Sequence, residues 1–263
     1  MLSYQHIYHA GNFADIHKHS ILCALWEALK KENDKPALYI DTHAGRGAYD
    51  LGSKEAQKIA EYKLGFSKLD LKRLPQDFAP YIKAIKRYAP RYPGSSACIA
   101  ALKSDADIMK LNELHPQEHK ALIKALGGAP NLRIQKKDGY KALLNTEFEG
   151  QGAQACVMID PSYEVKAEYA QLAENVLALV ERAPKIRMLI WYPILRQAQY
   201  HQEMLESLKL CTAPQLNSQL DLPEKIAPDK GMYATGLVLI NPPARFEPKL
   251  NKMTKILKAA LAQ

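Results

Sequence analysis

The octapeptide VMIDPSYE, residues 157–164, joins an apolar run to an acidic residue, a proline and an aromatic ring. Val157, Met158 and Ile159 suit a buried β-strand, whereas Asp160 and Pro161 suit the turn that ends such a strand. A surface turn has the same composition, so the octapeptide alone leaves open both a plain turn and an active-site loop. The flanking sequence has to distinguish them.

Similar apolar runs recur along the chain, and helical patterns, as at 116–126 and 169–182, separate most of them. The runs are KPALYIDTHAGRG (35–47), ADIMKLNEL (106–114), NLRIQKKDG (131–139), QACVMIDPSY (154–163), IRMLIWYP (186–193) and YATGLVLINPP (233–243). Strands that alternate with helices predict a doubly wound α/β sheet. The last run lies near the chain end and is predicted as a late hairpin strand. An earlier helix is predicted with Asp15 as its N-cap, which places Lys18 and His19 in its first turn, facing the edge of the core.

Composition and length indicate a globular cytoplasmic protein. The chain has 263 residues, of which 47% are hydrophobic, so it can bury one α/β domain with an insertion. It contains no uninterrupted run of about 18 apolar residues, and its N-terminus lacks the pattern of a secretory signal. The four cysteines are widely scattered, which disfavours a zinc ribbon or a disulfide scaffold. No metal site and no membrane partner are predicted.

The positive charge is concentrated in one segment. The formal net charge is +8, and residues 54–91 hold ten basic and four acidic residues, a local net charge of +6. Such a cluster suits a polyanion such as nucleic acid, although a solvated helical surface has the same composition. We predict that residues 52–102 form a basic helical insertion after the first strand, and that 1–51 and 103–263 form the catalytic domain.

An acidic residue follows each of four successive apolar runs: Asp41, Glu113, Asp138 and Asp160. Ligands of doubly wound sheets bind outside the carboxyl ends of the strands, so these residues are expected to gather around one site. The glycines at 45 and 47 would let the backbone approach a ligand closely. Glu113 could hold ribose hydroxyls and Asp138 could accept a hydrogen bond from an adenine amino group, although plain turns and surface charges use the same residues.

The order of these elements resembles that of S-adenosylmethionine-dependent methyltransferases with a seven-stranded sheet. Within that class, the motif [DNS]PP[YFW] marks enzymes that methylate a conjugated amino nitrogen, and DPSY at 160–163 resembles it. The resemblance implies that Asp160 and the carbonyl of Pro161 accept the hydrogens of the target amine, and that Tyr163 stacks on the base. Ser162 replaces the second proline, which keeps the carbonyls but loosens the loop.

Segments along the whole chain resemble one family, the bacterial 23S ribosomal RNA adenine(2030)-N(6) methyltransferases of the J type. They are MLSYQHIYHAGNFADIHKHS (1–20), YIDTHAGRGAYDLGS (39–53), RYPGSSACIA (91–100), NELHP (112–116), KDGY (137–140), IDPSYE (159–164), LIWYPI (189–194) and GMYATGLVLINPP (231–243). The resemblance implies an α/β, Rossmann-like, seven-stranded methyltransferase fold with a small helical insertion after the first strand.

The same resemblance implies the residues of the site. Asp160 is implied as the catalytic acceptor. The implied cofactor-binding residues are Lys18, His19, His43, Ser95, Glu113, Asp138, Gly139 and Asp160. The implied substrate-binding residues are Tyr4, His6, Pro161 and Tyr163. The cofactor would be S-adenosylmethionine, and the partner 23S ribosomal RNA, naked or in an early assembly particle. A DNA adenine or protein glutamine methyltransferase, and a non-catalytic RNA-binding protein on this fold, remain alternatives.

Overall fold

The chain has an α/β fold built on a mixed β-sheet. It is seen here in a computed structural model that describes residues 4–33, 35–148 and 154–263. Within these residues one sheet has seven strands in the order β5-β4-β1-β6-β7-β9-β8. The strands are Leu38–Asp41 (β1), Ile108–Asn112 (β4), Leu132–Gln135 (β5), Ala155–Ile159 (β6), Arg187–Leu195 (β7), Gln215–Asp221 (β8) and Met232–Ile240 (β9). Strands β5, β4, β1, β6 and β7 are parallel, and β9 runs antiparallel between β7 and β8. The seven-stranded fold implied by the resemblance is confirmed.

Strand β8 is absent from the strands predicted from apolar runs. Its sequence, QLNSQLD, has only two apolar residues, and of its positions only Ser218 and Leu220 are buried. It lies at the edge of the sheet, hydrogen-bonded to β9. An edge strand needs no continuous apolar run, which explains why it was missed. The predicted hairpin strand at the chain end is confirmed as β9.

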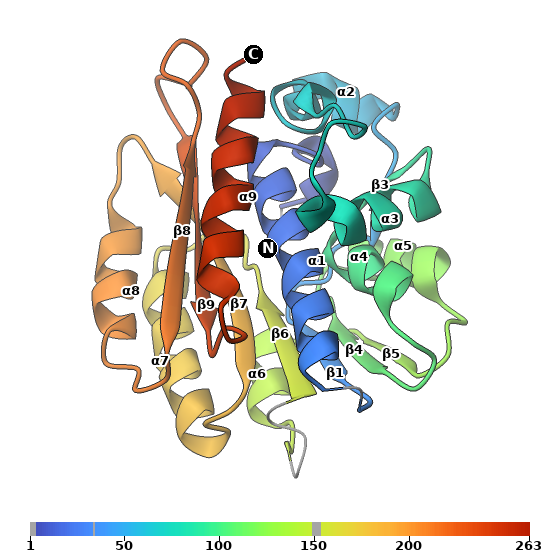
Figure 1. Ribbon diagram of the computed structural model, residues 1–263, viewed down its shortest axis with the longest axis vertical. Coiled ribbons are helices and arrows are strands. Elements are labelled where there is room, and N and C mark those ends of the chain that lie inside the picture. The colour runs from blue at the N-terminus through green and yellow to red at the C-terminus, as the bar shows by residue number, and fades with distance from the viewer. Residues whose placement is uncertain (1–3, 34, 149–153) are drawn as a thin grey trace.

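Two hydrophobic cores cover the two faces of the sheet. Alternate residues of β6 enter different cores: Cys156 and Met158 one, and Val157 and Ile159 the other. The first core contains the helices Phe13–Glu32 (α1), Ser95–Leu102 (α4), Pro116–Leu126 (α5) and Phe246–Leu261 (α9), and Figure 1 shows α1, α4 and α9 in front of the sheet. The second contains Gly139–Leu144 (α6), Ala167–Arg182 (α7) and Tyr200–Leu208 (α8). No helix of the described residues is long and apolar enough to cross a membrane.

The first turn of α1 differs from the prediction. The N-cap is Asn12, whose side chain accepts a hydrogen bond from the Asp15 backbone N–H, so the prediction that Asp15 caps the helix is wrong. Asp15 lies inside the first turn and is fully buried. Lys18 and His19 are 2% exposed, as their predicted inward position requires. One face of α1 therefore carries Asp15, Lys18 and His19 together.

The segment after β1 is mostly helical. It contains Lys54–Ile59 (α2), Ala79–Tyr88 (α3) and the 3₁₀ turns Glu61–Leu64, Phe66–Lys68 and Gln76–Phe78, as well as a two-stranded sheet of Ala48–Tyr49 (β2) and Tyr92–Pro93 (β3). Another 3₁₀ turn, His6–Tyr8 (η1), precedes α1. Phe78 and Tyr81 are fully buried in the core that contains α1. The division into a catalytic domain and an insertion at 52–102 stays a prediction.

Candidate active site

A cavity of about 1060 Å³ opens at the carboxyl ends of the parallel strands. The structure brings nearly all of the sequence-predicted site residues to its wall: Tyr4, His6, Lys18, His19, His43, Ser95, Glu113, Asp138, Asp160, Pro161 and Tyr163. Gly139 is the exception, and it packs directly behind the wall, because a Cβ built on it would lie 1.9 Å from the carbonyl oxygen of Thr42. The strand-end residues therefore share one site, as parallel-strand geometry predicts.

Glu113 and the glycine loop after β1 are joined at one end of the cavity. Gly45 has φ +58° and donates its backbone N–H to Glu113 Oε2 at 2.8 Å, while Oε1 accepts from the His115 N–H at 2.7 Å. Burial raises the pKa of Glu113 to about 7. Each oxygen keeps a further lone pair, so this carboxyl can still accept from ligand hydroxyl groups.

Asp138 and Gly139 link the end of β5 to the start of α6. Asp138 is the N-cap of α6, and its Oδ1 accepts from the backbone N–H groups of Tyr140 and Lys141 at 3.0 and 3.1 Å. Within the described residues Oδ2 has no hydrogen-bond partner, and Asp138 faces the cavity. The free oxygen is suited to accept from an amino group.

Two buried histidines flank the cavity as neutral rings. Burial lowers the pKa of His19 to about 3 and that of His43 to about 4. His19 Nδ1 is hydrogen-bonded to the Tyr92 hydroxyl at 3.0 Å, and His43 Nδ1 to the Thr42 hydroxyl at 2.8 Å. Neutral imidazoles add no positive charge that would repel a sulfonium ion.

Ser95 is turned toward a buried acid. Its hydroxyl donates to Asp41 Oδ2 at 2.6 Å, and the Tyr39 hydroxyl donates to the same oxygen at 2.8 Å. Burial raises the pKa of Asp41 to about 6. Asp41 thus fixes the start of α4 against the end of β1 and holds Ser95 at the cavity wall.

Asp160, at the end of β6, forms an ion pair with Lys18. The Lys18 Nζ lies 2.5 Å from Asp160 Oδ2, 3.2 Å from Asp15 Oδ1 and 4.9 Å from the centre of the Trp191 ring. Burial would lower the pKa of Lys18, but the two carboxylates outweigh it and raise that pKa to about 12. Lys18 is therefore a fixed cation beside Asp160.

The loop after Asp160 is held in an unusual backbone conformation. Tyr163 has φ +55°, which is uncommon for an aromatic residue, and its hydroxyl donates to the Trp191 carbonyl at 2.6 Å. Its ring packs on Tyr169 at 4.3 Å between centroids and on Trp191 at 5.7 Å. Side-chain packing therefore restrains the loop although Ser162 stands where the motif has proline.

The N-terminal segment forms part of the cavity wall, through Tyr4, His6 and His9. The Tyr4 hydroxyl is hydrogen-bonded to His6 Nδ1 at 2.7 Å, and the Tyr4 ring stacks on His9 with 5.7 Å between centroids. His6 Nε2 donates to Asp15 at 2.9 Å. The His9 ring is in turn hydrogen-bonded to Glu61 at 2.9 Å. Tyr4 and His6 are thus tied to the first turn of α1 and to the helical segment.

Sequence reasoning missed three parts of the wall. They are the end of β7, where Trp191, Pro193 and Leu195 line the cavity, the connection between β8 and β9 at 222–231, and the segment 59–64. In Figure 1 this connection and α2 lie at the same, upper end of the molecule. No acidic residue follows β7, so the pattern that found the other strand ends gave no signal there. Recognising β8 would have placed its turn at this end.

Metal chemistry has no site in the part of the chain that the structure describes. There, no group of three or more His, Cys, Asp or Glu side chains could hold an ion. Of the N-terminal histidines, His17 points away from the cavity and its Nε2 is hydrogen-bonded to the Ser218 hydroxyl at 2.9 Å. All four cysteines are buried and free.

Comparison with known proteins gives consistent matches over nearly the full chain. The family model described as "Ribosomal RNA large subunit methyltransferase D, RlmJ" matches residues 34–263. Proteins named ribosomal RNA large subunit methyltransferase J from Escherichia coli and Haemophilus influenzae are each 33% identical, over 99% of this chain and 94% of theirs. A crystal structure of a Legionella pneumophila protein has a TM-score of 0.87 and 31% identity, and the match covers 96% of this chain and 94% of that one. The chain belongs to the RlmJ family of ribosomal RNA large subunit methyltransferases.

Proposed function

We propose that the protein transfers a methyl group from S-adenosylmethionine to the exocyclic nitrogen of an adenine in 23S ribosomal RNA. The observation that carries this proposal is the position of the DPSY loop. Asp160 follows β6, which lies in the sheet between β1, β4 and β5, whose ends lead to Gly45, Glu113 and Asp138, and β7, whose end also lines the cavity. A methyl donor held at the ends of β1, β4 and β5 and a base held on the β7 side would meet at Asp160.

The residues around Asp160 suit the chemistry of an amino nitrogen. The lone pair of adenine N6 is delocalised into the ring, so the nitrogen is a poor nucleophile until acceptors hold its hydrogens. The Asp160 carboxylate and the Pro161 carbonyl would supply these acceptors and orient the nitrogen. S-adenosylmethionine supplies an electrophilic methyl carbon when bound. Asp160 would accept the N6 proton as the nitrogen takes up the methyl group and would pass that proton to water, while the leaving thioether would retain the electron pair of the broken bond.

The cofactor assignments follow from the donor set. Glu113 would accept from the ribose hydroxyls and Asp138 Oδ2 from the adenine amino group. His19, His43, Ser95 and Gly139 would shape the pocket around the sulfonium and the purine, with Lys18 and Asp160 at its inner end. On the β7 side of the cavity, Tyr163 would face the target base, and Tyr4 and His6 would close over it.

The decisive experiment follows a labelled methyl group from S-adenosylmethionine to nucleic acid. Purified protein is incubated with protein-free 23S ribosomal RNA, with an early ribosomal assembly particle, and with adenine-containing duplex DNA. Transfer to RNA supports the proposal, and the faster RNA substrate identifies the form that is recognised. Transfer to DNA alone would favour a DNA adenine methyltransferase, and binding without transfer a non-catalytic protein. We also propose that the enzyme acts in the cytoplasm, where bacterial ribosomes are assembled.

The basic segment supplies a prediction about RNA affinity. Lys83, Lys86 and Arg87 are exposed on α3. Replacing all three with alanine is expected to weaken RNA binding by roughly tenfold at low salt and to flatten its salt dependence, because fewer counterions are released. Affinity for S-adenosylmethionine should not change. Fluorescence anisotropy across a salt titration measures both effects.

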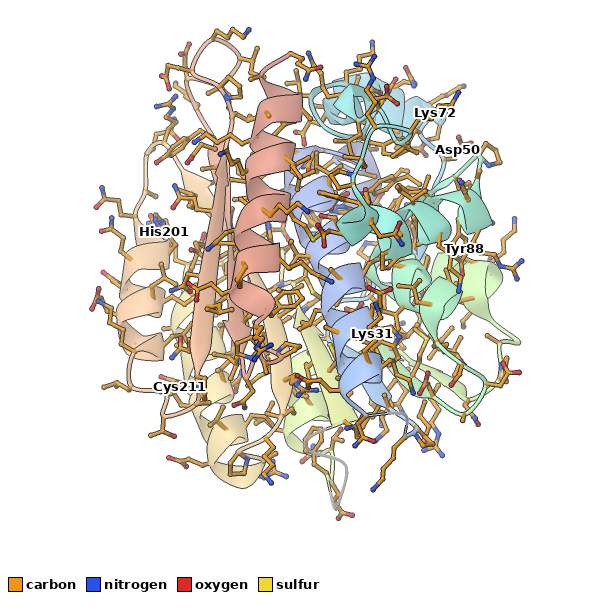
Figure 2. The ribbon with its side chains drawn as sticks, in the orientation of Figure 1. Lys31, Asp50, Lys72, Tyr88, His201 and Cys211 are labelled. Carbon is orange, nitrogen blue, oxygen red and sulfur yellow. The ribbon has the colours of Figure 1, made fainter. Side chains whose placement is uncertain are left out.

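A control for this variant removes the same number of charges from other helices. Lys31, Lys185 and Lys209 are exposed where α1, α7 and α8 end, and Figure 2 shows Lys31 in the lower half of the molecule and Lys72 of the basic segment near its top. The control triple variant should keep the parent salt slope. Equal losses in both variants would show that only total charge matters.

The N-terminal wall supplies a second prediction. Tyr4→Ala is expected to slow single-turnover methyl transfer by on the order of 10- to 100-fold, because the base loses part of its positioning surface, and to change the S-adenosylmethionine Kd by less than about threefold. Tyr88→Ala, which removes a half-buried tyrosine away from the cavity, is the control for lost packing. A lowered Tm with an unchanged rate constant for Tyr4→Ala would mean that the segment only stabilises the fold.

A further inference from the structure

Asp15 is a buried carboxylate with an unusual set of partners. It accepts a hydrogen bond from the Gly11 N–H at 2.8 Å and from His6 Nε2 at 2.9 Å, and its Oδ1 lies 3.2 Å from Lys18 Nζ. Its side chain is completely inaccessible to solvent. A buried charge without partners is strongly unfavourable, so a carboxylate here must be retained by the groups around it. Two of these partners, His6 and Lys18, also line the cavity that Asp160 lines.

The Lys18 ammonium group bridges two carboxylates of unequal exposure. The side chains of Asp15 and Lys18 are 0% and 3% exposed, whereas that of Asp160 is 14% exposed toward the cavity. Asp160 Oδ2 is the nearer partner of Lys18, and a target amine would need the same carboxylate. A single lysine paired only with Asp160 would neutralise the acceptor that the amine requires.

We infer that Asp15 is a positioning residue that shares the Lys18 ammonium group with Asp160, so that Asp160 can accept the hydrogens of the target amine. This inference rests on the proposed function. When the amine approaches, Lys18 needs to move only from one carboxylate toward the other and remains paired throughout. Asp160 then keeps its negative charge for the amine, and no charge is left buried without a partner.

The electrostatics of Asp15 support its role as the permanent partner. Burial alone would raise the pKa of Asp15, but His6, which also donates a hydrogen bond to it, and Lys18 hold that pKa well below its usual value. The group is therefore ionised throughout the range in which the enzyme can be assayed. The Gly11 N–H, which lies just before α1, also holds the Asp15 carboxylate in place. Lys18 therefore has a second, fixed ion-pair partner besides Asp160.

The test is Asp15→Asn, which keeps the shape and removes the charge. The single-turnover rate constant at saturating S-adenosylmethionine and RNA is expected to fall on the order of 10- to 100-fold, with both Kd values within about threefold of the parent. Asp107→Asn is the matched control. Like Asp15, Asp107 is fully buried, pairs with a lysine (Lys30 at 2.8 Å) and accepts backbone N–H groups. Unlike Asp15, it precedes β4 and so lies at the end of that strand away from the cavity. Its variant should melt lower and keep the parent rate constant.

A double variant separates action through Lys18 from simple loss of structure. Lys18→Met removes the ammonium group and keeps the stem, so adding Asp15→Asn should change the rate by less than about threefold if Asp15 acts through Lys18. Should the asparagine variant not fold, Asp15→Glu retains the charge and should stay within about tenfold of the parent rate. Multiplicative losses in the double variant, or an unchanged rate in Asp15→Asn, would overturn the inference. Failure of the proposed function is distinct, because the parent protein itself would then transfer no methyl group.

Discussion

Asp160→Ala is expected to lower the single-turnover rate of methyl transfer by about 1000-fold or more, while S-adenosylmethionine still binds. The carboxylate is the acceptor nearest to the position proposed for the target amine, and loss of one oriented group at a reacting centre costs roughly 10² to 10³ in rate. Here the same change also releases Lys18, whose ammonium group would face the amine and repel it as positive charge develops on nitrogen. Cofactor binding by isothermal calorimetry and single-turnover methylation of RNA measure the two properties separately.

Asp160→Asn provides the graded comparison. Asparagine retains one carbonyl oxygen as an acceptor, and the related motif accepts asparagine at this position, so this variant should keep more activity than alanine. Equal and near-parent rates for both variants would remove Asp160 from the reaction. A parallel loss of cofactor binding and turnover would instead make Asp160 mainly a cofactor contact.

Gly139→Ala is expected to cause the largest change in cofactor affinity and folding. A Cβ on Gly139 would lie 1.9 Å from the Thr42 carbonyl oxygen, whereas real Cβ atoms essentially never approach within 3.0 Å. The three nearest atoms all belong to the Thr42 backbone, which cannot turn aside as a side chain can, so the loops after β1 and β5 must separate. We expect the Kd for S-adenosylmethionine to rise at least about tenfold and the free energy of unfolding to fall by about 2–4 kcal/mol.

A second glycine serves as the control. Gly52 has Asp50 Oδ1 as its near neighbour at 3.2 Å, the end of a flexible side chain, so Gly52→Ala should change neither quantity appreciably. Calorimetric titration and thermal melting check both variants. Unchanged cofactor affinity in Gly139→Ala would show that the contact between the two loops does not shape the binding site.

The part of the site that was predictable from sequence is the part built from local pattern. Asp138 and Asp160 each follow an apolar run, and parallel strands bring such positions together. The contact between Lys18 and Asp160 joins residues 142 positions apart, so no local pattern contains it. Asp15 was wrongly predicted as the N-cap of α1, because Asp and Asn are both common N-cap residues. The backbone conformation before α1, which no local pattern shows, makes Asn12 the N-cap.

The fold as a whole was predictable because buried parallel strands are continuous apolar runs, whereas β8 was not, because this edge strand has only two apolar residues. The connection between β8 and β9 shares this limitation. The connection lies at the cavity because β9 pairs with β7, which is a long-range contact. The sequence of the connection itself is typical of any surface loop.

The position of β9 also constrains the order in which the chain can complete its sheet during synthesis. β7 pairs with β9 and not with β8, so the open edge of β7 has no partner until residues 232–240 have emerged from the ribosome. An exposed central strand edge is a template for intermolecular pairing. Nascent chains that stall before residue 232, and truncations that remove β9, would thus be aggregation-prone even though every residue of the cavity wall up to the β8–β9 connection is already present.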